Sequence, residues 1–169
     1  MNHVISVLTE NKPGVLARVS SMFARRGFNI HSLAVGPTAD PTVSRMTVVV
    51  DGPEMEQIIK QLYKLVHTVK VIELLPGDRI EREIMMVRVS AEPKRRPEIL
   101  DAARIFGADP VDVGVATVTF ELSGEPERLA DFLELMRPYG IIDLVKSGRI
   151  ALSKDPKTKD AARAALRSA

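Results

Sequence analysis

The sequence predicts an α+β protein made of two ferredoxin-like βαββαβ domains in tandem. Two observations support this fold class. Runs rich in β-forming residues alternate with segments of helical periodicity in the same order in each half, and the turn-forming Pro76-Gly77-Asp78 separates the halves. We therefore expect a first domain over residues 1–76, a second over residues 77–153 and a basic tail over residues 154–169.

The first half begins with an alternating run that enters the turn Glu10-Asn11-Lys12-Pro13-Gly14. Apolar residues then recur at helical spacing until Arg25-Arg26-Gly27, where basic residues and a glycine are typical of a helix end. A second helix is expected to start at Gly52-Pro53. The expected strands are 4–9, 28–35, 43–51 and 69–75.

The second half repeats this order, with helices opening at Pro97 and at Gly124-Glu125-Pro126-Glu127. Its expected strands are 83–91, 109–115, 117–123 and 141–152. In the tail, Asp155-Pro156 can start a helix, but Leu166 is the only sizeable apolar residue. We expect a solvated terminal helix there rather than a docking peptide.

Composition excludes several classes of protein. The chain of 169 residues has no cysteine, which excludes disulfides and thiol chemistry, and it has neither a membrane-spanning apolar run nor a signal-like start. We therefore expect a cytoplasmic protein. Residues 1–76 carry a net +2 and residues 77–152 a net −3, so the basic excess lies in residues 153–169. A near-neutral body without aromatic residues on its central strands argues against nucleic-acid binding.

Motifs for catalysis are missing. The sequence contains no G-x-G-x-x-G, P-loop, H-E-x-x-H or G-x-S-x-G pattern. His3, His31 and His67 are spread through the first half. His3 and His31 could face each other across neighbouring strands, but ordinary structural histidines are the favoured interpretation. We expect no catalytic residue and no metal site.

The loop Asn11-Lys12-Pro13-Gly14 is the candidate binding element. A helix N-terminus presents unpaired N–H groups to an anion, and Gly14 lacks the Cβ that would block its approach. Asn11 offers a donor and acceptors, which suits a ligand that carries both a carboxylate and an ammonium group. Alternatively, Asn11 caps the helix and Gly14 only makes the turn. The loop alone leaves both interpretations open.

Asn29 is an amide within an otherwise apolar β run. It is either an edge residue or part of a pocket shared between subunits. If two such sheets pair edge to edge, the strand start of one protomer approaches the loop of its partner.

Several segments resemble one known family. They are Thr9–Arg18 (TENKPGVLAR), Arg26–Leu33 (RGFNIHSL), Gln61–Val66, Gly140–Val145 and Ser147–Leu152. Together they are similar to the small regulatory subunits of acetolactate synthase (acetohydroxyacid synthase), whose amino-terminal domain is an ACT domain. The resemblance extends to about Ser153.

The resemblance implies a non-catalytic subunit that forms a homodimer, binds and activates the catalytic large subunit, and confers feedback inhibition by a branched-chain amino acid, usually valine. It assigns effector binding to Asn11 and Gly14, with Asn29 from the neighbouring protomer, and less directly to Val15 and Ile30. Thiamine diphosphate, Mg and FAD would belong to the large subunit, leaving this chain without a cofactor of its own.

The second half lacks an N-x-x-G loop and has Ala91–Pro97 (AEPKRRP) in its place. We therefore expect the first domain to sense the effector and the second to contribute subunit contact and activation. A free-standing amino-acid-binding ACT regulator and an RNA-binding ferredoxin-like protein are the alternatives.

Overall fold

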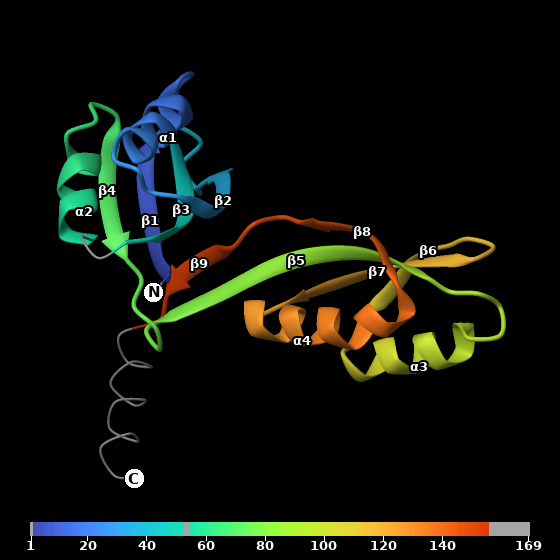
Figure 1. Cartoon of the computed structure of the whole chain (residues 1–169). Helices are drawn as coiled ribbons and strands as arrows, with labels where there is room; N and C mark the ends of the chain where they lie inside the picture. The colour runs from blue at the N-terminus through green and yellow to red at the C-terminus, as the bar shows by residue number, and fades with distance from the viewer. Residues whose placement is uncertain (1, 53–54, 156–169) are drawn as a thin grey trace, which may run out of the picture. The chain divides into compact units, whose positions relative to one another are not determined.

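The computed structural model describes residues 2–52 and 55–155, and it confirms the predicted fold class (Figure 1). Two antiparallel sheets each carry two α-helices. The described residues form two compact units. Unit 1 contains those up to Ile80 together with those from Arg149 onward, and unit 2 comprises Glu81–Gly148.

Unit 1 has the strand order β2-β3-β1-β4. Its first six elements are β1 (Asn2–Glu10), α1 (Val15–Arg25), β2 (Ile30–Pro37), β3 (Val43–Asp51), α2 (Met55–Tyr63) and β4 (Thr68–Glu73). The expected start of the second helix falls partly on Pro53, which lies outside the described residues. Because β2 has a neighbour on one side only, it is an edge strand.

Strand β1 is buried on both faces. Ile5 and Val7 face α1 and α2 and are fully buried, with Val19, Phe23, Ile58 and Leu62 from the two helices in the same core. Val4 lies on the other face of β1 and is also fully buried. Alternate side chains of β1 therefore point into two different apolar environments, one on each face of the sheet. Each face needs further apolar side chains to bury it.

The second cover comes from β9 (Ile150–Ser153), which lies in unit 1. Ala151 packs with Val4, Val49 and Leu74 in a small separate cluster. β9 also pairs with β5 (Arg79–Ser90), and the backbone N–H of Lys154 donates to the Asp78 carbonyl at 2.9 Å.

This arrangement corrects the prediction of one strand over residues 141–152 in a second domain over 77–153. Gly148 has φ +82°, a left-handed conformation that ends the extended run. The run is divided into β8 (Ile141–Lys146) and β9, and only β8 belongs to unit 2. Of the predicted tail, the residues from Pro156 onward lie outside the described part of the chain.

Unit 2 has the strand order β6-β7-β5-β8. Besides β5 and β8, it contains α3 (Arg96–Ile105), β6 (Asp109–Val113), β7 (Thr117–Gly124), α4 (Pro126–Met136) and the 3₁₀ turn Arg137–Tyr139. The Phe132 ring packs between two other rings, with centroids 5.5 Å from Phe106 and 6.2 Å from Phe120. Among the described residues, no helix combines the length and apolar character needed to cross a membrane.

The β9 cluster predicts that Ala151→Asp destabilises unit 1. Ala151 is 5% exposed, so the substitution places a carboxylate among apolar side chains. We expect the free energy of unfolding to fall by about 2–4 kcal/mol in urea titrations followed by circular dichroism. The matched control is Leu152→Asp, because Leu152 is 55% exposed. Its effect should stay within about 0.5 kcal/mol. Equal losses from the two variants would contradict the assignment of Ala151 to this core.

Candidate functional site

The loop between β1 and α1 has the backbone that an anion site needs. Gly14 precedes α1 with φ +80° and ψ −5°, in the left-handed region. A Cβ built on Gly14 would meet nothing within 4 Å, so the glycine is required by its conformation and leaves open space in front of the helix. The backbone N–H groups of Gly14, Leu16 and Ala17 have no backbone partner among the described residues.

Asn11 connects this loop to the turn between β2 and β3. Its side-chain Nδ2 donates to the Pro41 carbonyl at 3.0 Å, and its backbone N–H donates to the Thr42 carbonyl at 2.7 Å. No side chain caps α1, so the alternative in which Asn11 caps the helix is wrong. Because Nδ2 is engaged, Oδ1 of this exposed side chain is the atom that remains to accept a hydrogen bond from a ligand.

The turn that holds Asn11 was not predicted as part of the site. Asp40 accepts hydrogen bonds from Thr42 at its carboxylate, 2.9 Å from the backbone N and 2.6 Å from Oγ1. These bonds lower the pKa of Asp40 below its ordinary value. The Asp-Pro-Thr sequence is a turn signal of this kind, but nothing local in it indicates that Asn11 is its partner.

Val15 and Ile30 are less exposed than the other residues of the predicted site. The Val15 side chain is 5% exposed and belongs to the core of unit 1, so only its backbone borders the loop. Ile30 is half-buried and packs against the same core. Asn29 is exposed beside it, with Nδ2 3.5 Å from Nδ1 of His31.

The structure does not bring Asn29 and Ile30 to the Asn11 loop within one chain. Ile30 pairs with Val50, which pairs with His3 near the start of β1, whereas Glu10 at the end of β1 pairs with Val43. The seven residue-to-residue steps from His3 to Glu10 span roughly 23 Å of strand. The two halves of the predicted site therefore lie at opposite ends of the sheet.

Glu10 forms a charged cluster beside the loop. Its carboxylate lies 2.6 Å from Nζ of Lys12 and 3.1 Å from Nδ1 of His67. Hydrogen bonds from Lys12 and then from His67 lower the pKa of Glu10 from its ordinary value of 4.5. This cluster connects the loop to the segment that precedes β4.

The other histidines form separate pairs. His3 lies 2.8 Å from Glu73, and His31 lies 3.0 Å from Asp51. The prediction that His3 and His31 could face each other across neighbouring strands is wrong, because β3 lies between β1 and β2. Within residues 2–52 and 55–155, no three His, Cys, Asp or Glu side chains are grouped in a way that could hold a metal ion.

In unit 2, a side chain links the corresponding loop to the turn between β6 and β7. The Arg96 guanidinium donates to the Ala91 carbonyl at 3.1 Å and to the Gly114 carbonyl at 2.9 Å. Arg95 precedes α3 with φ −97°, so no left-handed residue opens this helix. The two units share a fold, but of their two first helices only α1 is preceded by a left-handed glycine.

A βαββαβ unit with an open glycine loop in front of its first helix defines the class of ACT domains, and a family model confirms this assignment. The model described as "AHAS small subunit-like ACT domain" matches residues 5–70. A second model, "Small subunit of acetolactate synthase", matches residues 82–155. The chain belongs to the family of acetolactate synthase small subunits.

Individual relatives agree with this family. A probable acetolactate synthase small subunit of Archaeoglobus fulgidus is 47% identical over 93% of this chain and 99% of its own length. The acetolactate synthase small subunit of Mycolicibacterium smegmatis is 46% identical over 95% of this chain and 96% of its own. The crystal structure of the small subunit from Thermotoga maritima superimposes with a TM-score of 0.84 at 35% identity and covers 92% of this chain and 98% of that one.

The Glu10 cluster predicts a specific dependence of stability on pH. A folded-state pKa below the unfolded value stabilises the protein above about pH 4.5, and this contribution is lost as the pH falls through the folded-state pKa. We expect the parent to be more stable than Glu10→Gln at about pH 6, with the difference disappearing in acid. Urea titrations at each pH measure it.

Glu56→Gln is the matched control for this measurement. The Glu56 carboxylate is exposed and lies 3.5 Å from Lys60 on the same helix, a kind of pair that contributes little to stability. A pH-dependent difference as large for Glu56→Gln as for Glu10→Gln would show that the cluster beside the loop has no special role.

Proposed function

We propose that this chain is the regulatory subunit of an acetolactate synthase in branched-chain amino acid biosynthesis. In this proposal it binds and activates the catalytic large subunit in the cytoplasm, and valine bound between two copies of unit 1 inhibits the complex. The chain performs no chemistry itself, and thiamine diphosphate, Mg and FAD belong to the large subunit. Membership of the small-subunit family supports this role.

The observation that carries the proposal is the separation of the two halves of the site. Pro37 at the end of β2 pairs with Ser44, which pairs with Thr9, so the end of β2 lies level with the loop. If the edge strands β2 of two copies pair in antiparallel fashion, the start of one β2 lies beside the end of the other. Asn29 of each copy then reaches the Asn11 loop of its partner.

Such a pocket suits a small amino acid. The free N–H groups at the start of α1 receive the carboxylate, since they are unpaired and lie at the positive end of the helix. Oδ1 of Asn11 accepts a hydrogen bond from the ammonium group, and Asn29 supplies a second amide from the other copy. Ile30 borders the aliphatic side chain of the bound amino acid. Val15 contributes its backbone N–H only in part, because this group already donates to Lys12 at 3.4 Å.

Inhibition then follows from linkage. Valine favours the arrangement of the dimer that supports the less active state of the large subunit, with a coupling free energy of about 1–3 kcal/mol. Unit 1 is the sensing unit, and unit 2 contributes contacts that activate the large subunit. The start of α3 supports this division, because Arg95 precedes it with φ −97° and no left-handed glycine opens the helix.

The first test combines the chain with the acetolactate synthase large subunit of the same organism. We expect the parent to raise the rate of acetolactate formation and valine to reverse this effect. Asn11→Ala should retain activation, because it leaves the core intact, and should weaken inhibition by valine about tenfold or more. Binding of valine without any effect on a large subunit would instead indicate a free-standing amino-acid regulator.

The second test asks whether the site is shared between copies. Asn11→Ala and Asn29→Ala should each abolish tight valine binding measured by calorimetry. When the two variants are mixed and allowed to exchange subunits, half of the dimers are mixed, and each mixed dimer regains one intact site. About a quarter of the parent's valine capacity should return. No recovery, with exchange demonstrated, would contradict a site shared between two copies.

A further inference from the structure

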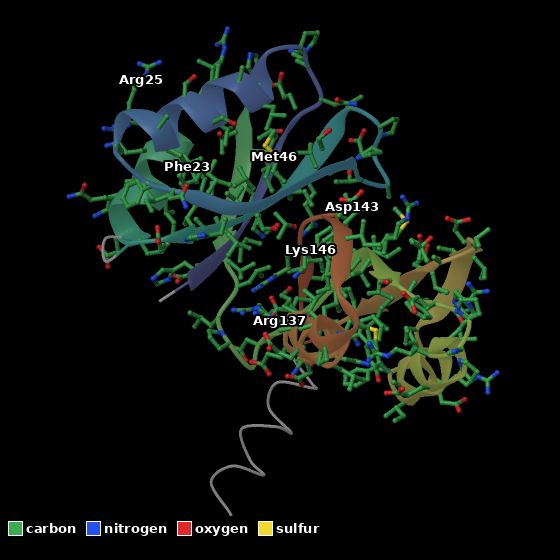
Figure 2. The ribbon with its side chains drawn as sticks, turned by 45° about the vertical axis from the view of Figure 1, so that its right-hand side comes forward. Phe23, Arg25, Met46, Arg137, Asp143 and Lys146 are labelled. Atoms are coloured by element: carbon green, nitrogen blue, oxygen red, sulfur yellow. The ribbon has the colours of Figure 1, made fainter. Side chains whose placement is uncertain are left out.

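The outer face of the helices in unit 1 carries a groove rich in positive charge. Its volume is about 460 Å³, and it lies between α1 and the end of α2. Met22 and Leu65 contribute apolar surface to its lining, and Arg18, Arg25, Arg26 and Lys64 provide the charge. We call it the α1–α2 groove. Figure 2 shows Arg25 projecting away from the sheet, whereas Phe23 lies beneath α1 and faces the core.

The four cations of the groove are not neutralised. All four side chains are exposed, and none of them forms an ion pair with a carboxylate among the described residues. Elsewhere on the helices the pattern differs: Arg104 lies 3.4 Å from Asp101, and Arg137 lies 3.0 Å from Glu134. The sequence explains the difference for the three arginines, because no aspartate or glutamate stands between Glu10 and Asp40.

Unneutralised cations at close quarters repel one another and attract anions over roughly 10 Å at 0.1 M salt. Carboxylates are suitable partners, because guanidinium groups bind them with two parallel hydrogen bonds. The apolar lining limits the choice further. Met22, which is 6% exposed, and the half-buried Leu65 give the groove a limited apolar surface that an apolar side chain of the partner can contact.

These features favour an acidic protein segment over a free phosphate compound. A pocket for a small anion holds its cations in place by hydrogen bonds that converge on one point, whereas none of these four side chains is fixed by a partner. An open groove with cations along its sides and apolar side chains in its lining fits a segment that presents several carboxylates and at least one apolar residue.

We propose that the α1–α2 groove binds an acidic segment of the large subunit. The inference rests on the proposed function and adds to it a direct contact between the sensing unit and the catalytic partner. Helix α1 starts at the effector loop and also provides Arg18, Met22 and Arg25 to the groove. One rigid helix therefore borders both the valine site and the proposed contact, and a displacement at one end is felt along its length.

The test is the double variant Arg25→Glu/Lys64→Glu, with Lys70→Glu/Lys94→Glu as the control. Lys70 and Lys94 are also exposed and unpaired among the described residues, so both variants change the charge equally. Affinity for the large subunit is measured by analytical ultracentrifugation at several salt concentrations. We expect the groove variant to bind about tenfold more weakly at low salt and the control to change less than about twofold. The affinity of the parent should fall more steeply with salt than that of the groove variant.

Calorimetry with valine and thermal unfolding establish that the groove variant is intact. If the glutamate variant unfolds early, Arg25→Gln/Lys64→Gln replaces it, with a smaller loss of affinity expected. Unchanged affinity for the large subunit would overturn the inference, as would an equal loss in the control. The parent is also compared with the groove variant for binding of tripolyphosphate. If only the parent binds it and the two bind the large subunit equally well, the groove is a site for a small anion instead. A parent that binds no large subunit would overturn the proposed function as well.

Discussion

The burial of β1 on both faces is the constraint on which unit 1 depends. β1 is hydrogen-bonded to β3 on one edge and to β4 on the other, and Val4 and Ile5 on its opposite faces are both fully buried. A strand in this position cannot shift its register, since a slip of one residue would exchange the two sets of side chains. The loop that follows Glu10 is therefore presented at a fixed point on the sheet. This packing sets the position of the candidate site on the sheet, and the hydrogen bonds of Asn11 to Pro41 and Thr42 then hold the loop.

Most of the fold was predictable because its signals are local. Alternating residues identified β1, helical spacing identified α1, and glycine with proline identified the turns. The error at the C-terminal end has a physical cause. Residues 141–152 are rich in β-forming side chains on both sides of Gly148, and a left-handed glycine is not distinguished by sequence from one in an extended strand. Ala151 packs against Val4, which lies about 150 positions earlier in the chain. No local sequence pattern predicts a contact over that separation.

The sequence names candidate residues for the site but does not give their arrangement in space. The amide of Asn11 and the glycine at position 14 have recognisable chemistry, and a shared pocket between subunits followed from Asn29 as a hypothesis. The sequence left undecided whether Asn11 caps α1. The hydrogen bond from Asn11 to Pro41 answers this, because it commits the side-chain nitrogen to a neighbouring turn. The register of β2 against β3 then places Asn29 and Asn11 at opposite ends of one sheet. Pairing registers are long-range properties, and a single sequence does not specify them.

Helix α1 gives the proposed regulation a physical route. Its buried face is held by Val15, Val19 and Phe23 against the sheet, so the helix moves as a unit or not at all. At its N-terminus lie the unpaired N–H groups, and its outer face supplies cations to the α1–α2 groove. A ligand that binds more tightly to one position of α1 changes the affinity of the groove for its partner, and the partner must change the affinity for the ligand by the same factor. The two sites need not touch: the proposed regulation requires only that the shared helix takes two positions against the core and that each ligand favours one of them.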